Sequence, residues 1–135
     1  MALTISEIKI IIEKVPAAEK NMPALVVDNK ILTWKEILHN HVERNSAVMG
    51  KIISEIEEIR KKCEEKRFDF EIDLSENEIS LARQRLSSMP SDMRIITLGT
   101  MFAKKDLIKQ LDDKTSLGSR IARRELNYVA TLWSK

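Results

Sequence analysis

The side chains most able to do chemistry in this sequence are two histidines, His39 and His41, with an acidic neighbour, Glu43. Positions two apart on a helix face different directions, whereas positions four apart are neighbours, so His39 can pair with Glu43. Such a pair supplies one edge of a metal site, but zinc needs three or four protein ligands, and HNHVE lacks the H-E-x-x-H spacing. We therefore predict a solvated histidine–glutamate pair and no metal ligands.

The other chemistry to look for is a nucleophile with an adjacent base, and the single cysteine is Cys63. Its neighbours include Glu64, Glu65 and two lysines, with no histidine nearby in sequence to activate a thiolate. The chain has only three glycines, too few for a glycine-rich phosphate-binding loop. No residue is left as a candidate for catalysis or for cofactor binding. We predict a non-enzymatic protein, with a small enzyme of unknown class as the third hypothesis.

Basic side chains gather in the C-terminal third. Residues 94–135 contain nine Lys or Arg against four Asp or Glu, a net charge of +5, whereas the whole chain has +2. Arg120, Arg123 and Arg124 lie on the second of two expected helices joined by a short connector, which is the arrangement of a helix-turn-helix. Two acids in the connector and Glu125 beside the arginines oppose phosphate binding. A nucleic-acid-binding module is therefore the alternative hypothesis.

Three short segments share one pattern, in which a Ser or Thr precedes a Glu by three residues and apolar residues flank the pair. A hydroxyl and a carboxylate at this spacing satisfy each other's backbone N–H groups as a capping box, so each segment predicts a helix start. The three pairs are Thr4 with Glu7, Thr33 with Glu36, and Ser75 with Glu78. The residues that follow each copy do not match, so the pattern indicates local helix starts and no internal repeat.

Strand signals are fewer. Two apolar runs flank Asp28-Asn29, a pair that tolerates the positive φ angles of a tight hairpin turn. Residues 68–74 alternate apolar and acidic side chains and predict a third strand, and residues 94–98 are a weaker fourth candidate. We expect a small antiparallel sheet of two to four strands.

The strongest feature is the stretch 34–66, which has no proline and predicts one helix about 50 Å long. Its apolar residues follow a heptad rhythm and form one seam. Asn45 interrupts the seam; it either fixes the register with a partner or faces water. The seam residues are Leu38, Val42, Asn45, Met49, Ile52, Ile56, Ile59 and Cys63.

Together these signals predict a mainly α, α+β fold in one domain, 1–135. Residues 1–33 form a helix and the hairpin, 34–66 the central helix, and 67–135 short strands and three helices near 76–88, 104–113 and 117–133. A 50 Å helix exceeds the roughly 35–40 Å width of such a domain, so part of its apolar seam would be exposed.

The leading hypothesis is therefore an assembly or protein-interaction subunit, which binds itself or another helical protein through the seam. A polar substitution at Ile56 would then disrupt assembly and leave most of the helicity. No apolar run approaches the about 20 residues that cross a bilayer, and the N-terminus lacks a signal pattern. We expect a cytoplasmic protein with no membrane partner.

Overall fold

Three helices begin at the three predicted capping boxes. The computed structural model describes residues 3–65, 74–97 and 99–134, and it is 61% helical. The Ser or Thr hydroxyl accepts from the glutamate N–H at 3.1, 3.1 and 3.2 Å, and each glutamate carboxylate accepts a bond in return. The helices that start there are α1 (Ile5–Lys14), α2 (Trp34–Glu36) and α4 (Glu76–Ser88).

The predicted hairpin is confirmed. Strands β1 (Pro23–Val27) and β2 (Lys30–Thr33) pair antiparallel, and Asp28 and Asn29 have φ angles of 51° and 65°. Two successive residues with positive φ make a type I′ turn, whose twist matches that of the strands.

A second hairpin is formed by β3 (Arg94–Thr97) and β4 (Thr100–Ala103), which confirms the weaker strand prediction at 94–98 for its first four residues. The two hairpins are separate two-stranded sheets. Of the strand predicted at 68–74, residues 68–73 lie outside the described residues. Leu74 is described and is not in a strand.

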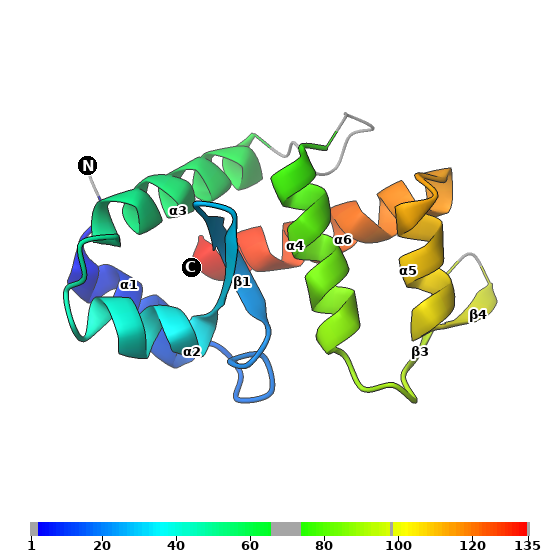
Figure 1. The fold of residues 1–135 in the computed structure, drawn as a ribbon, viewed down its shortest axis with the longest axis horizontal. Coiled ribbons are helices and arrows are strands. Elements are labelled where there is room, and N and C mark those ends of the chain that lie inside the picture. Colours follow the sequence, from blue (N-terminus) through cyan, green and yellow to red (C-terminus); the bar gives the residue numbers. More distant parts are fainter. Residues whose placement is uncertain (1–2, 66–73, 98, 135) are drawn as a thin grey trace.

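The prediction of a single long helix at 34–66 is wrong. Helix α2 continues as a π-helix, η1 (Ile37–Val42), the chain then reverses direction, and α3 (Met49–Glu64) runs back above α2 (Figure 1). The break centres on Asn45, whose φ of 46° is left-handed. Ser46 stabilises the turn, because its hydroxyl bonds His41 Nδ1 at 2.8 Å and accepts from the Val48 N–H at 3.3 Å.

Helix α6 (Ser116–Trp133), preceded by α5 (Lys104–Asp112), takes the central position that had been predicted for 34–66. Its C-terminal half enters a first core with α1, β1 and α3, and most of its buried N-terminal face enters a second core with α4 and α5 (Figure 1). Among the described residues, no helix is both long enough and apolar enough to cross a membrane.

Candidate nucleic-acid interface

The turn that leads into α6 is fixed by side chains of its own. Lys114 takes a left-handed φ of 56°, and Thr115 is the N-cap, accepting from the Gly118 N–H at 3.0 Å. The Thr115 hydroxyl also lies 2.7 Å from Gln110 Oε1 on α5. The end of α5 and the start of α6 are therefore held together across a three-residue connection, as in a helix-turn-helix.

Gly118 sets how closely the two helices approach. A Cβ atom at this position would lie 2.7 Å from the Leu111 Cα and 2.6 Å from the Gln110 carbonyl carbon. Real Cβ atoms do not come this close to backbone, so only glycine fits the crossing. Helix α4 packs against both α5 and α6 and completes a three-helix unit.

The outward side of α6 carries arginine and no acid. Arg120 and Arg124 are exposed and Arg123 is half-buried, and polar or small side chains fill the rest of this side. We call this surface the α6 stripe; it consists of Ser116, Ser119, Arg120, Arg123, Arg124, Asn127, Tyr128 and Thr131. Residues 116 and 131 are 15 positions apart, so the stripe is about 22 Å long.

The one acid of α6, Glu125, lies outside the α6 stripe. Its side chain is 13% exposed, and its carboxylate accepts from Arg85 Nε at 3.3 Å. Because Glu125 adjoins Arg124 in the sequence, it was predicted to oppose phosphate binding. Adjacent positions on a helix point about 100° apart, so Glu125 lies outside the α6 stripe although it borders the same surface hollow as Arg124. Its contact with Arg85 weakens the objection.

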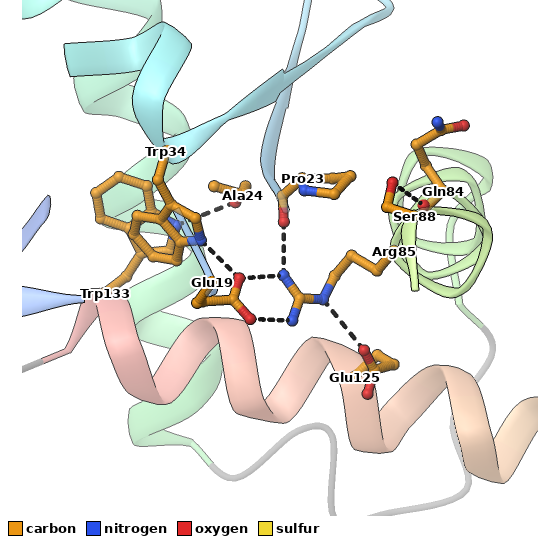
Figure 2. Close-up of polar contacts among 9 residues, drawn as sticks. All are labelled: Glu19, Pro23, Ala24, Trp34, Gln84, Arg85, Ser88, Glu125 and Trp133. Atoms are coloured by element: carbon orange, nitrogen blue, oxygen red, sulfur yellow. Dashed lines mark hydrogen bonds and ion pairs between the residues drawn. The ribbon is translucent and has the colours of Figure 1, made fainter. Parts of the chain in front are cut away.

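Arg85 is the centre of a buried polar network (Figure 2). Its guanidinium is paired with Glu19 through two bonds of 2.8 Å and also donates to the Pro23 carbonyl at 2.6 Å. Glu19 accepts a further bond of 2.8 Å from Trp34 Nε1. Burial lowers the pKa of Arg85, but the hydrogen bonds and charges of Glu19 and Glu125 outweigh this effect and raise it above its ordinary value.

The same network fixes the rotation of α6. At the C-terminal end of the helix, Trp133 stacks on Trp34 with ring centroids 4.3 Å apart and donates to the Ala24 carbonyl at 3.1 Å. At the middle, Glu125 is held by Arg85. Two buried anchors therefore hold one side of α6 inward and leave the α6 stripe facing solvent.

Of the two acids predicted to lie in the connector, Asp112 is the last residue of α5 and Asp113 begins the three-residue connection. Asp112 bonds Arg83 on α4 through two oxygens, at 2.8 and 3.3 Å, and both side chains are about half exposed. The hydrogen bond and the charge of Asp112 raise the pKa of Arg83. Asp113 is exposed. One of the two connector charges is thus matched by a cation.

The apolar seam predicted on 34–66 lies largely inside the protein. Four of its eight residues are at most 6% exposed and pack in the first core, three are partly buried against the two cores, and one faces solvent. The buried residues are Val42, Met49, Ile52 and Ile56. The partly buried ones are Leu38, Ile59 and Cys63, and the residue that faces solvent is Asn45.

The predicted histidine–glutamate pair is confirmed, since His39 Nδ1 lies 3.2 Å from Glu43 Oε2 and both side chains are about half exposed. In the part of the chain that the structure describes, no three His, Cys, Asp or Glu residues lie close enough to hold a metal ion.

Sequence reasoning missed Arg85 and its partners. The signal was present, because an arginine at 85 follows Leu81 and Ala82 at helical spacing and so lies on the buried stripe of α4. Its partner Glu19 is 66 residues away, and periodicity carries no information about a pairing at that distance.

Comparison with protein families, curated proteins and solved structures found no match to this chain.

Proposed function

We propose that this protein binds duplex DNA, with the α6 stripe in the major groove. The observation that supports the proposal is the separation of charge across α6: Arg120 and Arg124 are exposed on the outward side, and the one carboxylate, of Glu125, lies off that side and is engaged by Arg85. Arginine, asparagine, serine and threonine are the side chains that contact phosphates and base edges in DNA interfaces. The three-residue turn and the close α5–α6 crossing present the helix in the manner of a recognition helix.

The test is fluorescence anisotropy with a labelled random-sequence DNA duplex across a range of salt concentrations. If Arg120 and Arg124 each neutralise one phosphate, log K falls with log salt at a slope of about −1.8. Between about 50 and 200 mM salt, the affinity then drops about 12-fold. The variant with Arg120→Gln and Arg124→Gln should flatten the slope by about 1.8.

The control removes the same charge elsewhere, through Lys9→Gln and Lys35→Gln on the exposed surfaces of α1 and α2. Its slope and affinity should match those of the unmodified protein. Duplex RNA is the second probe, because its major groove is too deep and narrow for a helix to read. Absence of DNA binding in low salt, or an equal loss in both variants, would refute the proposal. Tighter binding to duplex RNA than to duplex DNA would contradict binding in the DNA major groove.

A second candidate function is self-assembly, favoured by one observation at the β3–β4 hairpin. Ile96 and Met101 face each other across the two strands and are 65% and 62% exposed. An apolar cross-strand pair in solvent, beside strands with unpaired edges, is typical of a contact surface. The predicted α3 seam does not support this function as well, because its central residues already pack in the first core.

Light scattering on a sizing column tests the second candidate. A dimer that becomes a monomer on Ile96→Ser and Met101→Ser would support assembly through the hairpin, and a monomeric unmodified protein would exclude it.

A further inference from the structure

An open hollow of about 320 Å³ lies between the end of α4, the segment after it, β3 and α6. Its walls are mostly apolar, from Met89, Met93, Ile95 and Ile121. Its volume is at the lower end of the range of about 300–1,000 Å³ that is usual for small-molecule sites. It is separate from the buried network, which it meets only at Glu125.

Two arginines from different elements border this hollow. Arg94 belongs to β3 and Arg124 to α6, and both are exposed. Arg94 Nη1 donates to the Met93 carbonyl at 3.1 Å, and no ion pair joins either arginine to another described residue. Glu125, the one acid at the hollow, is engaged by Arg85. The charges available to a ligand are therefore positive.

The wall formed by the end of α4 is held in place. Lys104, the first residue of α5, donates to the carbonyls of Ser87 and Met89 at 2.6 and 2.7 Å. These bonds satisfy carbonyls at the end of α4 and tie that end to the start of α5. Met89 and Met93 can adapt their unbranched side chains to ligands of different outline.

We infer that this hollow binds an amphipathic organic anion, in which an apolar aryl or alkyl body carries one carboxylate or sulfonate. The body would lie on the methionine and isoleucine side chains, and the acid would lie between Arg94 and Arg124, whose guanidinium groups can each form paired hydrogen bonds with it. A charged ligand is favoured over a neutral one because two cations and no unengaged carboxylate border the hollow.

The test compares two fluorescent probes that share an apolar body. 8-Anilinonaphthalene-1-sulfonate carries the anion, and N-phenyl-1-naphthylamine lacks it. We expect saturable one-to-one binding of the sulfonate, at least about tenfold tighter than the neutral probe. The double variant Arg94→Met and Arg124→Met should remove this preference and leave neutral-probe binding unchanged. Arg120→Met, on the same helix outside the hollow, should change neither.

Three results would overturn the inference: equal affinity for the two probes, an unchanged sulfonate affinity in the double variant, or no saturable binding up to about 1 mM. Met93→Asp gives an independent check, because this exposed side chain can change without disturbing the core and should weaken both probes.

A consequence for DNA binding rests on the proposed function. A ligand that engages Arg124 removes one phosphate contact, so the sulfonate should displace DNA and the neutral probe should not. If the sulfonate binds but the protein never binds DNA, the proposed function fails and the ligand site stands. If DNA binds in the manner expected but the sulfonate does not bind, only the ligand site fails.

Discussion

Replacing Gly118 with alanine tests how closely α5 and α6 cross. In most helix interiors this change stabilises a protein by about 0.5–1 kcal/mol, because alanine loses less backbone freedom on folding. Here the added Cβ would meet the Leu111 Cα at 2.7 Å and the backbone of Gln110 even closer. Carbon atoms prefer a separation of about 3.5–4.0 Å, so α5 and α6 must part by roughly 1 Å.

The atoms in conflict belong to the backbone, so no side-chain rotation can relieve the contact. Overpacking of this kind lowers the free energy of unfolding by about 1–3 kcal/mol. Because the backbone of α5 cannot move aside easily, we expect Gly118→Ala to cost near the upper end, about 2–3 kcal/mol. For a chain of this size we expect the melting temperature to fall by about 8–12 °C.

The matched control is Gly50→Ala on α3, where nothing lies within 4 Å of the added Cβ. This variant should gain about 0.5–1 kcal/mol, so the two glycines should respond with opposite signs. Urea unfolding followed by circular dichroism measures both. If Gly118→Ala is as stable as the unmodified protein, the helices do not cross this closely, and the argument for a fixed α5–α6 unit fails.

Three further substitutions have expected outcomes that unfolding experiments can check. Ile56→Asp places a charge in the first core and should unfold the protein, with loss of the far-ultraviolet helix signal, instead of only dissociating an assembly. Arg85→Met leaves Glu19 buried without its partner and should cost about 3–5 kcal/mol; a urea-unfolding loss below about 1 kcal/mol would mean that the pair is not buried in solution. Lys114→Gly removes the strain of a left-handed backbone at an exposed position and should raise the free energy of unfolding by about 0.5–1 kcal/mol, with a slightly higher melting temperature. A lower melting temperature would contradict the turn geometry.

The elements that the sequence predicts well are those set by neighbouring residues. Thr33 and Glu36 satisfy each other's backbone N–H groups whatever surrounds them, and Asp28-Asn29 tolerates its turn without tertiary help. Both features depend on contacts within four positions of the chain, so the pattern alone was enough to place them.

The long helix failed for a different reason. A heptad rhythm says which residues face an apolar surface, but it does not say whether that surface is one straight groove or a core approached twice. Val42 and Met49 lie seven residues apart and are both buried, although the chain reverses direction between them. The local signal was Asn45-Ser46, because both residues offer the backbone bonds that compete with a helix.

The charge of α6 illustrates a related limit. From its composition the helix has three arginines and one glutamate, and proximity in sequence places Glu125 beside Arg124. Helical geometry points these neighbours about 100° apart, and Arg85, from another helix, engages the carboxylate away from the α6 stripe. The contact that stabilises the interior therefore also pairs the one acid of α6 with a cation. The electrostatic complementarity to DNA that we propose would therefore depend on the buried network as well as on the arginines, and it could not be predicted from the helix alone.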